Sequence, residues 1–178
     1  MNKEVAVFAG GCFWCTEAVF NQLNGIISAK PGYSGGDVVN PTYEEVSSGE
    51  TGHAEAIQIE FNPEEISYKD LLTVFFASHD PTQLNRQGAD VGEQYRSAIF
   101  YMNEGQQKQA QEYIDELKAE GIDVVTQLEE SSAFYEAEDY HKNYFERNKN
   151  AAYSQAVISP KLEKVQEQFQ NLLKTHHK

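Results

Sequence analysis

The 178-residue sequence is poor in cysteine, in positive charge and in long hydrophobic stretches. It contains only two cysteines, too few for the disulfide framework of a small secreted protein. Its 14 lysine and arginine residues stand against 28 acidic ones, which gives a net charge of −14. A chain this acidic repels nucleic acid and anionic membranes, so we expect neither as a partner. No apolar run approaches the about 20 residues that a transmembrane helix needs.

The sequence also lacks the signals of secretion and of division into several domains. Residues 1–4 lead straight into a predicted strand, without the charged segment and apolar stretch of a secretory signal, so we expect a cytoplasmic protein. Internal repeats and long Pro/Gly/Ser linkers are missing too. We therefore predict one domain over residues 1–178, with a core at about 4–148 and a C-terminal helical extension at about 159–175. Nothing in the sequence requires more than a monomer.

Hydrophobic periodicity predicts the order of the main elements. The predicted strands are 5–9, 26–31, 54–61, 95–102 and 122–128, and the predicted helices are 15–23, 67–78 and 106–120. A long loop with some helical turns is expected over 33–52. The order strand-helix-strand-strand-helix-strand matches the split β-α-β, ferredoxin-like arrangement. We therefore predict an α+β fold with a mixed, mostly antiparallel sheet.

The last third of the chain is expected to be irregular and to end in a helix. Ala137–His141 is predicted to open one helix, and Ser159-Pro160 is a typical start for another. Apolar residues at helical spacing then form one stripe: Leu162, Val165, Phe169, Leu172 and Leu173. We expect this stripe to dock onto the domain rather than to bind a partner.

The two cysteines lie three residues apart, Cys12 and Cys15, at the turn between the first strand and the first helix. N–H groups at a helix start favour a thiolate, which is the nucleophilic form. Residues three apart on a helix have Cβ atoms about 5–6 Å apart, whereas a disulfide needs about 3.8 Å. The pair can therefore form a disulfide only with local adjustment, which suits a bond that forms and breaks. Two buried, inert cysteines are the alternative.

Zinc is a further alternative for the cysteine pair. Two cysteines supply half of a tetrahedral site, and His53, His79 and His141 could supply the rest. None of these histidines has the paired spacing of structural zinc sites, so we predict no metal site.

Glu55 is the most informative residue outside the turn. In the predicted strand 54–61 it shares a face with Ile57, Ile59 and Phe61. If that face is buried, the carboxyl is desolvated and its pKa rises above about 4.3, which suits a general acid. A solvated carboxylate at a frayed strand end is the alternative.

Other polar residues carry no pattern that marks them as functional. Tyr43 and Tyr95 lie in or beside loops, from which their hydroxyls can reach a cleft, but the pattern does not set them apart from the other tyrosines. It does not set Asp90 or Arg96 apart either. The remaining tyrosines are interpreted as packing residues, among them Tyr113, Tyr135, Tyr140, Tyr144 and Tyr153.

Several longer motifs occur together and in a fixed order. They are Gly11-Cys12-Phe13-Trp14, Gly32-Tyr33-Ser34-Gly35-Gly36, Asn40-Pro41-Thr42-Tyr43, Thr51-Gly52-His53-Ala54-Glu55-Ala56, His79-Asp80-Pro81-Thr82, Tyr95-Arg96-Ser97-Ala98-Ile99 and Ala137-Glu138-Asp139-Tyr140-His141. Over about residues 5–148 the chain resembles the class A peptide methionine sulfoxide reductases. Enzymes of this kind reverse the oxidation of methionine.

The resemblance implies roles for individual residues. Cys12 matches the nucleophile, and Glu55 matches the acid that protonates the sulfoxide oxygen. Tyr43 and Tyr95 match the hydroxyls that hold this oxygen. The resemblance also implies selectivity for the S epimer, with free methionine sulfoxide or oxidised proteins as substrates.

Three further residues are implied in the same way. Phe13 and Trp14 match the aromatic wall around the substrate methyl group, where contacts between sulfur and rings are favourable. Asp90 matches an acidic residue of the active-site network.

The resemblance leaves the recycling of the enzyme less defined. Many relatives carry resolving cysteines near the C-terminus, whereas this chain has none beyond Cys15, and position 47, cysteine in some relatives, is Ser47. A sulfenic acid on Cys12 condenses with a nearby thiol, which leaves Cys15 as the internal candidate. Thioredoxin or another thiol is the expected reductant, and no bound cofactor is expected. Direct attack of an external thiol on the sulfenic acid is one alternative. A general thiol–disulfide oxidoreductase that does not need Glu55 is another.

Overall fold

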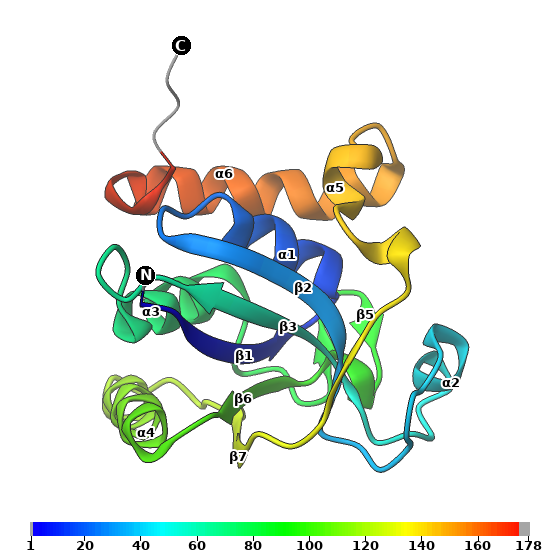
Figure 1. The fold of residues 1–178 in the computed structure, drawn as a ribbon, viewed down its shortest axis with the longest axis horizontal. Helices are drawn as coiled ribbons and strands as arrows, with labels where there is room; N and C mark the ends of the chain where they lie inside the picture. The colour runs from blue at the N-terminus through cyan, green and yellow to red at the C-terminus, as the bar shows by residue number, and fades with distance from the viewer. Residues whose placement is uncertain (1, 175–178) are drawn as a thin grey trace.

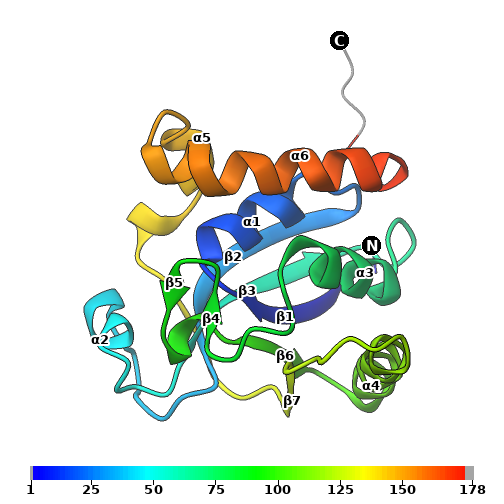
Figure 2. The same ribbon diagram turned by 180° about the vertical axis from the view of Figure 1, so that it is seen from behind.

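The computed structural model describes residues 2–174, which form a six-stranded mixed sheet with helices packed on one face (Figures 1 and 2). The strands lie in the order β7-β6-β1-β3-β2-β8. Their bounds are β1 Glu4–Gly10, β2 Ile26–Ser34, β3 Ala54–Phe61, β6 Ser97–Tyr101, β7 Gln127–Glu130 and β8 Phe134–Glu136. Neighbours are antiparallel except for the parallel pair β6 and β7. A small hairpin pairs β4 (Arg86–Gln87) with β5 (Asp90–Val91).

The four inner strands have the topology that the sequence predicts. The order β6-β1-β3-β2, with antiparallel pairing throughout, is that of the split β-α-β arrangement. The α+β prediction is therefore confirmed, and β3 has the predicted bounds of residues 54 and 61.

The helices are α1 Phe13–Asn21, α2 Tyr43–Ser47, α3 Tyr68–Ser78, α4 Glu104–Ala119, α5 Tyr144–Arg147 and α6 Ser159–Gln168. Single 3₁₀ turns lie at Glu93–Tyr95, Asp139–His141 and Gln170–Leu172, and a π-helical turn, Ser154–Ile158, leads into α6. In Figures 1 and 2, α1 lies between the sheet and α6, and the two helices are in contact. None of the helices within residues 2–174 is long and apolar enough to cross a membrane.

The start of α6 differs from the prediction, because helical backbone precedes Ser159. In the π turn the N–H of Ser159 donates to the carbonyl of Ser154. Pro160 follows at the first turn of α6 and has no N–H to donate, which interrupts the regular α-helical ladder. The predicted extension ends at 175, and that residue lies outside the described part of the chain.

Two other predicted elements differ from the structure, since the strand expected over 122–128 begins only at Gln127, as β7, and the helix expected to open at Ala137–His141 does not form there. Residues 122–126 form no strand: Val125 donates its N–H to the carbonyl of Pro81, while Ile122 and Val124 pack against the main core. Their apolar pattern reflects packing rather than strand pairing. Of residues 137–141 only Asp139–His141 form a 3₁₀ turn, and the carboxylate of Glu138 accepts hydrogen bonds from the hydroxyl of Tyr33 and the N–H of Tyr43. The helix α5 begins only at Tyr144, after Asn143, whose φ of +54° is left-handed.

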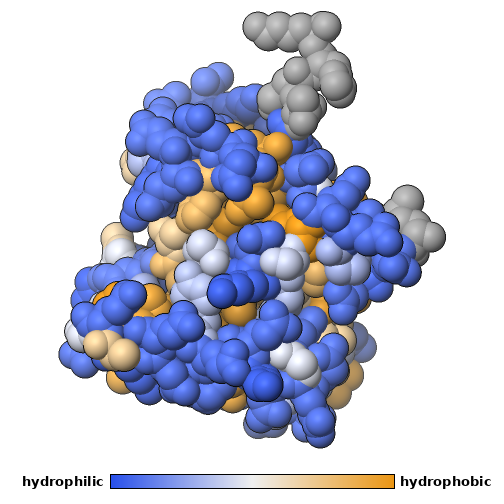
Figure 3. Space-filling view, turned by 90° about the vertical axis from the view of Figure 1, so that its left-hand side faces the viewer, coloured by the Kyte–Doolittle hydropathy of each residue, from blue (hydrophilic) through white to orange (hydrophobic). Residues whose placement is uncertain are grey.

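The main core lies between the sheet and the helices α1, α3, α4 and α6. Ile57 and Ile59 of β3 belong to it, on the same face of the strand as Glu55. Val165 of α6 is fully buried there, and the rest of the predicted stripe packs against this core. The docking of this stripe onto the domain is therefore confirmed. Figure 3 shows one face of the molecule, where apolar side chains gather in a hollow framed by hydrophilic ones.

Candidate active site

The site begins at a glycine turn that ends β1 and starts α1. Gly11 has a φ of +95°, a left-handed conformation that side chains other than glycine adopt at a cost. Cys12 follows as the N-cap of α1, and its carbonyl accepts hydrogen bonds from the N–H groups of Cys15 at 3.1 Å and Thr16 at 3.4 Å. Its thiol takes no part in capping, so at the helix start the side chain of Cys12 is available to other partners.

Gly11→Ala should distort this turn and lower activity. A Cβ at Gly11 would lie 2.8 Å from the Cβ of Gln87, in addition to the strain of a positive φ. We expect a loss of about 2 kcal/mol in the free energy of unfolding, measured by denaturant titration, together with reduced turnover. Gly49→Ala is the matched control, because Gly49 has a φ of +80° and a Cβ added there would meet nothing within 4 Å. Equal stability and turnover in the two variants would contradict this view of the turn.

Cys12 is a thiol in the resting protein. Burial raises the pKa of the Cys12 thiol well above its usual range, and the charges of Glu55 and Cys15 raise it further. The N–H of Trp14 at the helix start lowers this pKa, as the sequence predicts, but burial outweighs it. Activation of Cys12 therefore requires a change that accompanies substrate binding or proton transfer.

Glu55 faces the helical layer and is only 2% exposed. Its Oε1 accepts a hydrogen bond of 3.1 Å from the N–H of Phe13. Burial raises the pKa of Glu55 to about 8, the charge of Asp90 raises it too, and hydrogen bonds from Phe13 and Cys12 lower it. The carboxyl is therefore protonated at neutral pH, and the alternative of a solvated strand end is wrong.

Tyr43 and Tyr95 come to the same place from two different loops. Tyr43 begins α2, and its N–H donates to the Glu138 carboxylate at 2.9 Å. Tyr95 ends the 3₁₀ turn Glu93–Tyr95. Burial, and then the charge of Glu55, raise the pKa of both hydroxyls, that of Tyr43 to about 12. Both tyrosines thus keep a proton to donate close to Glu55 and Cys12.

The two aromatic residues after Cys12 differ in exposure. Phe13 is fully buried, whereas Trp14 is half-buried and offers surface. The Trp14 ring stacks on Tyr144 with centroids 3.7 Å apart, and its Nε1–H donates to Nδ1 of His141 at 3.0 Å. Burial lowers the pKa of His141, so the ring is neutral and its proton is on Nε2. His141 therefore orients Trp14.

Tyr153 is the residue that sequence reasoning missed. Its hydroxyl donates to Oδ2 of Asp90 at 2.8 Å and lies 3.7 Å from Sγ of Cys15. Its ring packs edge-on against Trp14 at 5.6 Å. The interpretation of Tyr153 as a packing residue alone is wrong. No local pattern could have revealed it, because Asp90 and Cys15 are 63 and 138 residues away.

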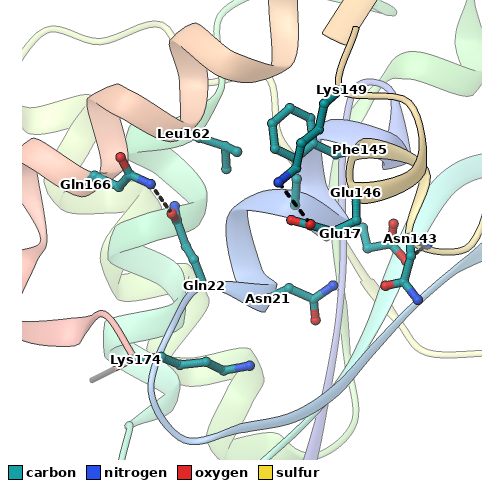
Figure 4. A pocket seen from close by; sticks show the side chains of 11 residues that line it. Glu17, Asn21, Gln22, Asn143, Phe145, Glu146, Lys149, Leu162, Gln166 and Lys174 are labelled. Carbon is teal, nitrogen blue, oxygen red and sulfur yellow. Dashed lines mark hydrogen bonds and ion pairs between the residues drawn. The ribbon is translucent and has the colours of Figure 1, made fainter. Parts of the chain in front are cut away.

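Among residues 2–174 the structure shows no cluster of three or more metal-ligating side chains that could hold an ion. A pocket of about 370 Å³ lies between α1, α5 and α6, on another side of α1 from the predicted site. Its wall includes Glu17, Gln22, Asn143, Lys149 and Gln166, and it contains none of the predicted site residues (Figure 4).

Comparison with known proteins decides the family. Residues 4–173 match the family model described as peptide methionine sulfoxide reductase. The chain belongs to this family. The resemblance inferred from the motifs is confirmed, and the protein is a methionine sulfoxide reductase rather than a general thiol–disulfide oxidoreductase.

Three matches to two relatives illustrate the range of similarity within the family. The peptide methionine sulfoxide reductase MsrA of Saccharolobus solfataricus is 55% identical, with 97% of this chain and 98% of that protein covered. The crystal structure of Mxr1 from Saccharomyces cerevisiae in reduced form has a TM-score of 0.80 at 34% identity, covering 84% of this chain and 87% of that one. Mxr1 in complex with Trx2 has a TM-score of 0.57 at 26% identity, covering 80% and 84%.

Proposed function

We propose that this reductase acts on methionine S-sulfoxide through attack of Cys12 on sulfur with acid assistance from Glu55. The observation that carries the proposal is a protonated, buried carboxyl beside the thiol at the start of α1. Burial raises the pKa of Glu55 to about 8, and a hydrogen bond links it to the N–H of Phe13, the residue after Cys12. A neutral acid in this position is a proton donor at neutral pH.

The first step balances as a transfer of oxygen from substrate to enzyme. The Cys12 thiol and the sulfoxide give methionine and a sulfenic acid on Cys12. Glu55 protonates the sulfoxide oxygen as the Cys12 sulfur attacks, and the thiol proton of Cys12 replaces the one that Glu55 gives up. Glu55 therefore does not remain negatively charged beside Cys12, where its charge would raise the pKa of the thiol.

The surrounding side chains stabilise the transition state and place the substrate. The hydroxyls of Tyr43 and Tyr95 donate to the oxygen as its charge develops. The exposed part of Trp14 receives the methyl group, while Phe13 supports it from the buried side. Asp90 holds the hydroxyl of Tyr153 at 2.8 Å.

The second half of the cycle uses Cys15. The Cys15 thiol and the Cys12 sulfenic acid give a disulfide and water. A dithiol reductant then restores both thiols, and no bound cofactor is required. Thioredoxin is the reductant we propose, supported by the similarity of this chain to Mxr1, which has been crystallised with Trx2.

We place the enzyme in the cytoplasm as a monomer, acting on free methionine sulfoxide and on oxidised proteins, without nucleic acid or membrane partners. The whole chain is one catalytic domain, because α6 packs on α1 and Tyr153 reaches the site from outside the 4–148 core.

Single-turnover chemistry without a reductant tests this proposal. The wild-type protein should release about one methionine per enzyme from the S epimer and none from the R epimer. Mass mapping of the product should then show a Cys12–Cys15 disulfide. A lone modified Cys12 would refute Cys15 as the resolving thiol, and no release from the S epimer would refute the reaction itself.

A further inference from the structure

Cys15 lies in surroundings that differ from those of Cys12. It is 2% exposed and lines a cavity of about 10 Å³, with space for about one water molecule. His79, at the C-terminal end of α3, and Lys161, in the first turn of α6, line the same cavity. Lys161 from the C-terminal segment thus lines the cavity of Cys15, whereas Tyr43 and Tyr95 do not.

The positive charge of Lys161 lowers the pKa of two groups that line this cavity, Cys15 and His79. Burial raises the pKa of Cys15, and the charge of Lys161 is the largest influence that lowers it. The same charge helps burial to lower the pKa of His79, which falls to about 4, so that His79 is neutral. Within the described residues Lys161 forms no ion pair with a carboxylate.

The hydroxyl oxygen of Tyr153 can accept the thiol proton of Cys15. The single hydroxyl proton of Tyr153 is donated to Asp90 at 2.8 Å. In the 3.7 Å contact between Tyr153 and Cys15, the thiol is then the donor and the tyrosine oxygen the acceptor. A proton can pass from Cys15 to Tyr153 as Tyr153 passes its own to Asp90.

We propose that Tyr153 and Lys161 are positioning residues that prepare Cys15 to resolve the sulfenic acid on Cys12. The inference rests on the proposed role of Cys15. The bond between the two sulfur atoms forms, the S–O bond of Cys12 breaks, and the departing hydroxide combines with the proton from Cys15 to give water. The proton of Cys15 passes to Tyr153 as that of Tyr153 passes to Asp90, and Asp90 returns a proton to the departing hydroxide. The ammonium of Lys161 stabilises the thiolate at the moment of attack.

The charges around Cys15 make the effect of Lys161 measurable. The titratable groups that face the thiol are Cys12, Glu55, Asp90, Tyr153, His79 and Lys161. Asp90 and Glu55 raise the pKa of Cys15, and Lys161 opposes them. Removal of the ammonium should therefore leave Cys15 less acidic.

The first experiment titrates the thiol in the Cys12→Ser background, where Cys15 is the only cysteine. Thiolate absorbance in the ultraviolet is followed against pH, and the double variant Cys12→Ser, Cys15→Ser supplies the tyrosine baseline. Lys161→Met should raise the pKa of Cys15 by about one unit, whereas Lys161→Arg should restore it. Lys164→Met is the matched control, because Lys164 lines only the neighbouring surface pocket and should leave the titration unchanged.

The second experiment measures the resolving step in the full enzyme by quenched single turnover. At neutral pH a tenfold smaller thiolate fraction is partly offset by higher intrinsic nucleophilicity, so Lys161→Met should slow disulfide formation about threefold to fourfold. Tyr153→Phe should slow disulfide formation as well. The release of one methionine per enzyme should be retained in Lys161→Met, and disulfide formation in Tyr153→Phe is measured relative to the methionine that this variant releases.

The outcomes separate this inference from the proposed function. Absence of methionine release from the wild-type enzyme would refute the proposed reaction. Normal release with an unchanged Cys15 titration and unchanged disulfide formation in Lys161→Met would overturn the role of Lys161. An equal effect of Lys164→Met would also overturn it, because it would show only a general effect of surface charge. Disulfide formation at the wild-type rate in Tyr153→Phe would overturn the role of Tyr153.

Discussion

Glu55→Gln should reduce the rate of sulfoxide reduction by about 10²- to 10⁴-fold, the usual contribution of a general acid. Glutamine keeps the size of the side chain and can still accept the hydrogen bond from the N–H of Phe13, but it has no acidic proton to give. The rate of methionine release in a single turnover measures this loss. Glu60→Gln is the matched control, because Glu60 lies on the same strand, on the other face, in an ion pair with Lys3.

The pH dependence of the wild-type rate should also show that Glu55 acts as a general acid. Glu55 acts in its protonated form, so activity should fall as the pH rises through about 8, the pKa to which burial raises this carboxyl. This limb of the profile should be absent in Glu55→Gln. An identical descending limb in both proteins would assign it to another group.

The protonation of Glu55 should also make the free energy of unfolding depend on pH. The pKa of Glu55 rises from 4.5 to about 8 on folding, so the folded protein holds a proton that the unfolded chain releases in this window. The stabilisation is complete below about pH 4.5 and is lost as the pH rises through about 8. Relative to Glu55→Gln, the free energy of unfolding of the wild type should fall by about 1.4 kcal/mol per pH unit between these values.

Cys15→Ser should uncouple the first turnover from recycling. The variant should still release about one methionine per enzyme, because Cys12 and Glu55 are intact, but steady-state turnover with thioredoxin should be lost almost completely. The sulfenic acid on Cys12 should persist, and a sulfenic-acid trap should label it far more than in the wild type.

Two controls define this result. Cys12→Ser should give neither the methionine burst nor trap labelling, which shows that the burst depends on Cys12. Undiminished steady-state turnover of Cys15→Ser with thioredoxin would show that the reductant attacks the sulfenic acid directly.

The sequence predicts the elements whose pattern is local. The alternation along β3 puts Glu55 on the same face as buried apolar residues, and the glycines before Cys12 mark the turn into a helix. The apolar run at 122–128 is misleading in its first half, because Val124 is buried and Ile122 half-buried by core packing and not by strand pairing. Periodicity reports burial, and it cannot tell which neighbour provides it.

Contacts between distant segments could not be predicted in this way. The hydroxyl of Tyr153 reaches Asp90 across 63 residues, and the carboxylate of Glu138 reaches the N–H of Tyr43 across 95. Such pairs depend on the path of the whole chain. They bring the C-terminal segment into the site, although the family resemblance of the motifs is strongest over about residues 5–148.

Trp14 is the only tryptophan of the chain, so it gives the enzyme a single indole fluorophore, two residues after Cys12. Its ring is stacked on Tyr144 and hydrogen-bonded to His141, so its emission depends on the packing of the site. Indole emission therefore carries no background from another tryptophan elsewhere in the fold. We expect substrate entry and disulfide closure, which both occur beside this ring, to change the emission of the unlabelled protein.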